Sequence, residues 1–140
     1  MRTNPFTFSE LKVGQIIEFQ HIIQKNDIQL FANLCVDHNP LHLKESFAKE
    51  LGFKSQVVHG MLVASLISRT VGMYFPGQWG VIVSQALNYK HPIYVNIPLK
   101  VKSEITEKYS SVRLIVLRTS IYNSNKKVCL EGETKVKVLK

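Results

Sequence analysis

The chain has 140 residues, of which 45% are hydrophobic and 20% charged, a balance typical of a globular domain with its own core. We therefore expect a single domain over residues 1–140. The longest apolar stretch, near residues 57–67, contains a histidine and is too short to span a bilayer. The first ten residues lack the pattern of a secretory leader. These features favour a cytoplasmic or organelle-matrix protein without membrane association.

The formal net charge of +8 is concentrated in the second half of the chain. Residues 76–140 carry eleven Lys or Arg and four Asp or Glu, whereas residues 1–75 carry seven and six. Basic residues alternate along predicted strands, as at Lys100 and Lys102, which is typical of a solvated sheet face. A surface for phosphate groups is the second interpretation. No aromatic and basic recognition motif is present, so we expect no nucleic-acid partner.

The first half of the chain predicts one strand and three helices. We expect the strand over residues 15–23 and a helix over 26–35 with Asn26 as its cap. A loop over residues 37–44 and a short helix ended by Gly52 follow. The helix expected over residues 60–71 has apolar residues on most sides, which predicts that it is buried. Gly72 is its expected end.

The second half predicts strands only, at residues 79–91, from Pro98 onward, at 112–122 and at 127–138. A hairpin turn is expected at residues 123–125. One sheet against one apolar helix is an α+β arrangement. A single helix leaves part of a five-stranded sheet uncovered, so we expect pairing with a second copy about a twofold axis.

The loop over residues 37–42 has the sequence Asp-His-Asn-Pro-Leu-His. The proline restricts the residue before it to extended conformations, and Asn39 can bond to its own backbone two residues on. Asp37 and His42 should therefore be held close together, as a pair able to move protons to and from a bound molecule. His59-Gly60 then opens the apolar helix, where bare backbone N–H groups favour a developing negative charge.

Three motifs resemble those of the MaoC-like (R)-specific enoyl-CoA hydratases in order and spacing. They are Asp37-His38-Asn39-Pro40-Leu41-His42, Val58-His59-Gly60-Met61-Leu62 and Ala64-Ser65-Leu66. The resemblance implies the hotdog fold, in which a curved antiparallel sheet wraps a long central helix. It also implies a homodimer with its sites near the dimer interface.

The resemblance also assigns roles to individual residues. Asp37 and His42 correspond to the catalytic pair, and the Gly60 N–H corresponds to the oxyanion donor. Asn39 and His59 are expected to shape the site, with His59 bracing the loop that presents Gly60. Ser68 is expected to lie by the acyl chain or to help place the catalytic pair, and Val71 is expected to help close the acyl pocket. The family motif often has an acidic residue where this chain has Lys44, a departure outside the catalytic pair.

The implied reaction is the reversible syn hydration of trans-2-enoyl-CoA to (3R)-3-hydroxyacyl-CoA. No metal site or redox cofactor is expected. The thioester carrier is coenzyme A or acyl carrier protein, and the basic second half suits the phosphates of the former or the acidic surface of the latter. The close alternative is a 3-hydroxyacyl-acyl-carrier-protein dehydratase of fatty-acid synthesis. A thioesterase or a non-catalytic acyl-CoA-binding or nucleic-acid-binding module is less consistent with the intact Asp37 and His42 pair.

Other candidate residues have expected structural roles. We expect Cys35 to be a small buried residue, without a disulfide to Cys129. Trp79 and Tyr89 are expected in the sheet core and not against a ligand.

Overall fold

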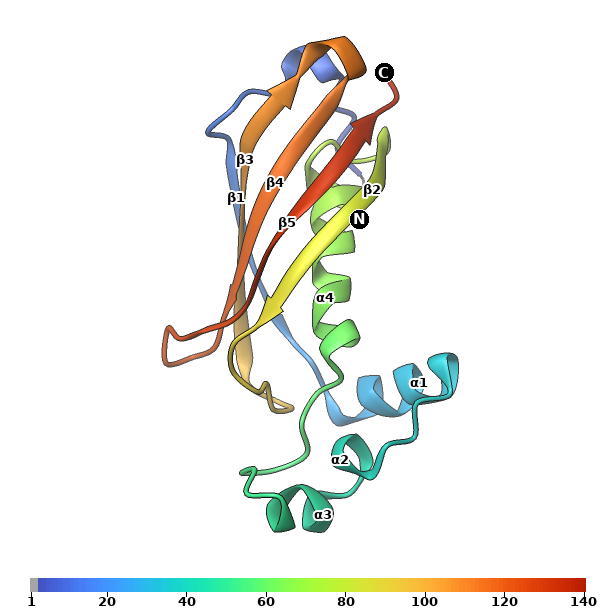
Figure 1. Ribbon diagram of the computed structural model, residues 1–140, viewed down its shortest axis with the longest axis vertical. Coiled ribbons are helices and arrows are strands. Elements are labelled where there is room, and N and C mark those ends of the chain that lie inside the picture. Colours follow the sequence, from blue (N-terminus) through green and yellow to red (C-terminus); the bar gives the residue numbers. More distant parts are fainter. Residues whose placement is uncertain (1–2) are drawn as a thin grey trace.

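Five antiparallel strands form one curved sheet in the computed structural model, which describes residues 3–140 (Figure 1). The strands lie in the order β1-β3-β4-β5-β2, so β1 and β2 are the two edges. Their bounds are Ile16–Ile22 for β1, Gly80–Tyr89 for β2, Pro98–Tyr109 for β3, Leu114–Tyr122 for β4 and Val128–Val138 for β5. All five predicted strands are present, with ends that differ by a few residues.

The two faces of the sheet follow the alternation of the sequence. Leu99, Val101 and Ile105 of β3 are buried on the face toward the helix. Lys100 lies on the opposite face, where its Nζ is 2.8 Å from a Glu18 carboxylate oxygen. The exposed lysines of β3 therefore cover a solvated face, as their alternation predicts.

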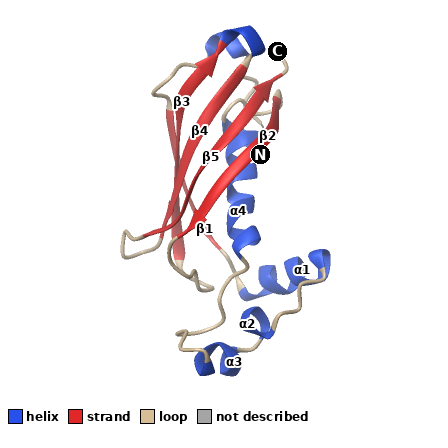
Figure 2. Ribbon diagram, viewed as in Figure 1, coloured by secondary structure: helices blue, strands red, loops and turns tan. Residues whose placement is uncertain are grey.

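The helix α4 (Gly60–Arg69) packs along the apolar face of the sheet (Figures 1 and 2). Val63, Leu66 and Ile67 are buried against β3, β4 and β5 in one core cluster. A second cluster, which includes Val71 and Phe75, fills the other end of the sheet. This arrangement confirms the predicted α+β class and the helix-and-sheet layout of the hotdog fold.

The helix α4 is buried on most sides, as predicted, but one side is exposed. Met61 is 63% exposed, and Ser65 and Ser68 are also exposed on the same side of the helix. Gly72 does not end the helical segment, because a π-helical turn, η2 (Thr70–Tyr74), continues through it. Gly72 is not among the glycines with positive φ, so it does not adopt the left-handed conformation that commonly ends a helix.

Three short helices lie beyond one end of the sheet, at the bottom of Figure 1. They are α1 (Lys25–Cys35), α2 (Pro40–Leu43) and α3 (Glu45–Glu50). Two 3-10 turns, η1 (Phe8–Glu10) and η3 (Ser110–Val112), complete the elements. No helix among residues 3–140 combines the length and apolarity needed to cross a membrane.

The start of α1 and the conformation of the following loop differ from prediction. Gln24, not Asn26, is the N-cap of α1, because the Asp27 carboxylate accepts a hydrogen bond from the Gln24 N–H at 2.8 Å. Part of the predicted loop is the helical turn α2. Pro40 occupies its first turn, and the Asn39 side chain caps it, so these two residues begin a helical turn within the predicted loop.

Candidate active site

The segment that follows α1 turns sharply to present Asp37. Val36 ends α1 in the left-handed conformation with φ 59°, which is uncommon for a β-branched residue. The Asp37 side chain then accepts a hydrogen bond from the Asn39 N–H at 3.2 Å. The Asn39 side chain accepts one from Leu41 N–H at 3.0 Å. These two side-chain bonds hold Asp37 next to α2 while leaving its carboxylate half-exposed.

His42 is fixed on α2 by bonds to a neighbouring segment. Its Nδ1 lies 2.7 Å from the Val57 carbonyl oxygen. Because a carbonyl oxygen only accepts, Nδ1 carries the proton and Nε2 keeps a free lone pair. The Gln56 side chain donates to the His42 carbonyl at 3.2 Å, and Val57 N–H donates to Leu41 O at 3.2 Å. The imidazole is therefore oriented with a basic nitrogen available.

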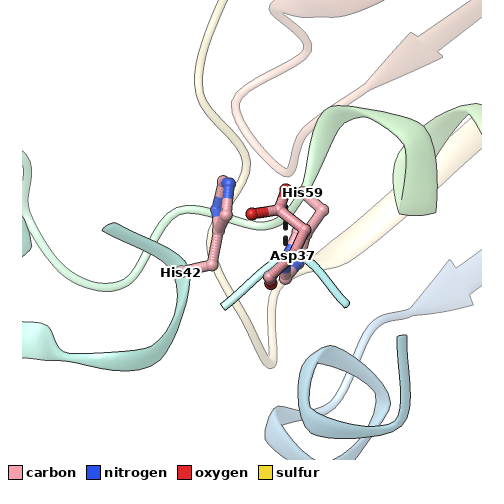
Figure 3. Close-up of side chains that lie close together, drawn as sticks. All are labelled: Asp37, His42 and His59. Atoms are coloured by element: carbon pink, nitrogen blue, oxygen red, sulfur yellow. Dashed lines mark hydrogen bonds and ion pairs between the residues drawn. The ribbon is translucent and has the colours of Figure 1, made fainter. Parts of the chain in front are cut away.

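His59 lies against both Asp37 and His42 and is only 2% exposed; Figure 3 shows the three side chains together. Its Nε2 donates to the Asp37 carbonyl oxygen at 3.1 Å and lies 3.9 Å from a carboxylate oxygen of the same residue. Its ring stacks on that of His42, with 3.8 Å between centroids. Its Nδ1 is buried and has no hydrogen-bond partner among the described residues. His59 thus contacts both members of the predicted pair.

Gly60 begins α4, directly after His59. The first N–H groups of a helix have no acceptor within the helix, and His59 provides no side-chain cap. The helix dipole adds partial positive charge at this end. A Cβ on residue 60 would lie 2.9 Å from Tyr89 Cε1, so the aromatic ring packs directly on the glycine. Only glycine leaves this contact unstrained.

A cavity of about 320 Å³ connects His42, Gly60 and Tyr89. The rest of its lining is mainly apolar, from Phe53, Val57, Val58, Val63, Ile93 and Cys129. An apolar cavity with a few convergent polar groups is the usual form of a small-molecule site. It places a basic nitrogen and a helix N-terminus within reach of one ligand.

The structure brings some predicted site residues together and separates others. Asp37, His42 and His59 each have one nitrogen or oxygen atom within 4.8 Å of those of the other two, and Asn39 and Gly60 adjoin them. Ser68 lies on the exposed side of α4. Val71 lies in the second core cluster. Of the predicted site residues only His42 and Gly60 line the cavity. Asp37 and His59 lie beside His42 at its edge, and Ser68 and Val71 lie elsewhere on the helical segment.

The expected positions of two other residues are wrong. Tyr89 is 51% exposed and lines the cavity. Cys35 is exposed at the end of α1, and neither cysteine is in a disulfide. The alternation of β2 does not reveal Tyr89 as a site residue, because β2 is an edge strand with exposed residues on both faces.

Asp37, His42 and His59 are also the donors that a divalent metal would use. His59 Nε2 is a poor ligand in this arrangement, because it donates its proton to the Asp37 carbonyl. The exchange of that proton to Nδ1 would leave a buried N–H without a partner. The three groups are therefore better arranged for proton transfer to and from a bound molecule.

Comparisons with known proteins agree with this site. The sequence profile described as "MaoC like domain" matches residues 8–126. The chain belongs to the MaoC-like family. An (R)-specific enoyl-CoA hydratase of Rhodospirillum rubrum is 34% identical over 131 residues, which cover 94% of this MaoC-like chain and 90% of the relative.

Further relatives include both hydratases and dehydratases. A mitochondrial 3-hydroxyacyl-[acyl-carrier-protein] dehydratase of Arabidopsis thaliana is 32% identical, with coverage of 88% of this chain and 75% of that protein. Among solved structures, the (R)-hydratase of Aeromonas caviae involved in PHA biosynthesis superposes with a TM-score of 0.88 at 33% identity. That match covers 91% of this chain and 97% of the other. The resemblance seen in the sequence motifs is confirmed.

Proposed function

We propose that this MaoC-like chain is an (R)-specific enoyl-CoA hydratase. It adds water reversibly across the double bond of a trans-2-enoyl thioester to give a (3R)-3-hydroxyacyl thioester. The observation that carries the proposal is the grouping of Asp37 and His42, which have polar atoms within 4.8 Å of each other, with His42 oriented by the Nδ1 bond to Val57 O at 2.7 Å and lining the same cavity as Gly60. The hydratase relatives at 33–34% identity support the same reaction.

Asp37 and His42 hold the attacking water between them. His42 Nε2 accepts one proton of the water as its oxygen bonds to Cβ, while the Asp37 carboxylate accepts the second O–H and orients the molecule. The imidazolium then delivers the proton to Cα on the same face. One water is consumed and His42 returns to its starting state. General acid–base assistance of this kind typically contributes about 10²–10⁴-fold in rate.

Negative charge develops on the thioester oxygen as water adds. The Gly60 N–H, at the positive end of α4, stabilises that charge. One donor of this type contributes roughly 2.7–4 kcal/mol in other enzymes. Because Asp37 and His42 together bind the water, and His42 takes up and returns its proton, the proposed reaction uses no metal or redox cofactor.

Two residues position this machinery. Asn39 holds the turn through its bonds to Asp37 and Leu41. His59 ties the Asp37 backbone to the start of α4. Ser68 and Val71 lie further along the same helical segment. Ser68 is exposed on a side of α4 that a second copy would cover, and it would contact the acyl chain only in such a dimer, whereas Val71 is buried in the second core cluster.

We propose a homodimer in which the edge strand β2 is covered. Val81 is 46% exposed and Val83 is 53% exposed on this strand, and an unpaired edge readily accepts another strand. The exposed Met61 of α4 adds to this apolar surface. Light scattering after size exclusion should give twice the chain mass, and Val83→Lys should reduce it. A monomer at all concentrations would contradict the proposal.

The test of the proposed function is the loss of enoyl-thioester absorbance when the protein is added to crotonyl-CoA. Chiral analysis should identify the (3R) alcohol. A thiol reagent should detect no release of free coenzyme A, which separates hydration from thioester hydrolysis. An inactive protein, or a (3S) product, would contradict the proposal.

A second candidate function uses the same chemistry in reverse, as a 3-hydroxyacyl-acyl-carrier-protein dehydratase. It is favoured by the two mitochondrial relatives of that name, at 31–32% identity, and by the basic second half of the chain. The ratio of kcat/KM for crotonyl-CoA and crotonyl-carrier-protein decides between the two. A large preference for the carrier-protein substrate would replace the hydratase assignment.

A further inference from the structure

Among the polar side chains of the cavity without a role in the proposed reaction, Tyr89 is the one that contacts Gly60. It is the last residue of β2, and its backbone is paired with Leu130 of β5. The following N–H groups, of Lys90 and His91, both donate to the Cys129 carbonyl, at 2.8 and 3.3 Å. These backbone hydrogen bonds fix the position of the Tyr89 main chain, although the ring itself is half-exposed.

The Tyr89 ring lies on the helix terminus that receives the thioester oxygen. The position of an added Cβ on Gly60 is 2.9 Å from Tyr89 Cε1 and 3.2 Å from Cζ. The ring carbon next to the hydroxyl and the carbon that bears it are thus the atoms closest to Gly60. The Tyr89 hydroxyl bonds to Met61 Sδ, so the phenol group lies beside the first turn of α4, which begins at Gly60, the residue of the proposed N–H donor.

The Tyr89 hydroxyl has a weak partner that a ligand oxygen can replace. Its hydrogen bond goes to Met61 Sδ at 3.7 Å, and a thioether is a poor acceptor. Met61 is exposed and has a flexible side chain. Burial raises the pKa of the Tyr89 hydroxyl above its ordinary value, so the phenol remains a donor at neutral pH.

We propose that Tyr89 is a second oxyanion donor, whose O–H leaves Met61 Sδ and binds the thioester oxygen together with the Gly60 N–H. This inference rests on the proposed function. Two donors on one oxygen are more effective than one, because the charge on that oxygen grows as water adds and both bonds strengthen with it.

The test compares Tyr89→Phe, which keeps the ring and removes only the hydroxyl, with Tyr122→Phe as a matched control. Tyr122 ends β4 and lies among Lys100, Lys102 and Lys126, away from the cavity. We expect Tyr89→Phe to lower kcat on crotonyl-CoA by about 10²-fold with KM little changed, as for an interaction that strengthens in the transition state. Tyr122→Phe should keep the wild-type kcat.

A second readout does not depend on turnover. Butanoyl-CoA labelled with ¹³C at its carbonyl cannot be hydrated, and infrared difference spectroscopy reports how strongly that carbonyl is polarised when bound. Binding to the wild type should lower the stretching frequency, and Tyr89→Phe should restore part of the shift. A purely structural role for the ring would leave the frequency unchanged.

The outcomes distinguish a failure of the proposed role of Tyr89 from a failure of the proposed hydratase function. An active wild type with equal kcat and equal carbonyl frequency in Tyr89→Phe overturns the role of Tyr89 and leaves the hydratase function intact. A wild type that neither hydrates crotonyl-CoA nor shifts the butanoyl-CoA carbonyl overturns both. A lower kcat together with a smaller carbonyl shift in Tyr89→Phe supports the second donor.

Discussion

Replacing His59 with leucine should reduce activity without much loss of stability, although the residue is only 2% exposed. Three contributions to the free energy of unfolding follow from its contacts. The bond from Nε2 to Asp37 O is worth about 0.5–1.5 kcal/mol net. The stacking on His42 is worth roughly 0.5–1.5 kcal/mol. Against these, the buried and unpartnered Nδ1 costs about 1–3 kcal/mol.

Leucine removes all three contributions and keeps a similar apolar volume. The change in the free energy of unfolding should therefore be within about 1 kcal/mol of zero, as measured by urea denaturation. The kcat should fall by about tenfold, equivalent to roughly 1.4 kcal/mol of lost positioning, because the Asp37 carbonyl is released. His59→Gln carries an amide N–H near the position of Nε2 and should recover part of kcat.

Two results would refute this reasoning about His59. A destabilisation of about 3 kcal/mol or more for His59→Leu, as in ordinary core truncations, would mean that Nδ1 is not an unsatisfied group. A fully active His59→Leu would mean that the bond to Asp37 does not position the site. Equal activity of the leucine and glutamine variants would assign the effect to the ring and not to the hydrogen bond.

Gly60→Ala keeps the backbone N–H but places Cβ 2.9 Å from Tyr89 Cε1. Because Tyr89 is half-exposed and its ring can turn aside, the free energy of unfolding should fall by no more than about 1 kcal/mol while kcat is reduced. A loss of about 3 kcal/mol or more in urea denaturation, as for a well-packed core, would contradict this packing argument. Cys129 is 1% exposed and burial raises its thiol pKa, so its thiolate forms only above the ordinary thiol pKa. Iodoacetamide at neutral pH should therefore modify the exposed Cys35 first, as mass spectrometry of the Cys35→Ser variant would check.

Much of the fold could be predicted because period-2 alternation and a long apolar helix are local signals. The strands at residues 98–109 and 128–138 are easily predicted from the sequence, because their residues alternate between the core and the solvent. The errors lie where tertiary contacts decide. Whether the sides of α4 are covered depends on what packs against each, so the sequence does not show that Met61 is exposed.

The pairing of Asp37 with His42 was also predictable, because both lie in one short loop with Asn39-Pro40 between them. The tautomer of His42 was not, since it depends on Val57, fifteen residues away. The contact of Tyr89 with Gly60 joins residues that are far apart in sequence, and no local pattern marks it. Val36 in the left-handed region gives no signal either, because valine is a rare choice there.

The central claim is that Asp37 and His42 carry the proton transfers of a hydratase. The most direct test is to measure kcat on crotonyl-CoA for the Asp37→Asn and His42→Ala variants. His38→Ala serves as the control, because His38 lies in the same loop and is exposed. We expect each of the first two changes to lower kcat by at least about 10²-fold and the control to match the wild type. A His42→Ala or Asp37→Asn variant with near-wild-type kcat would contradict the account.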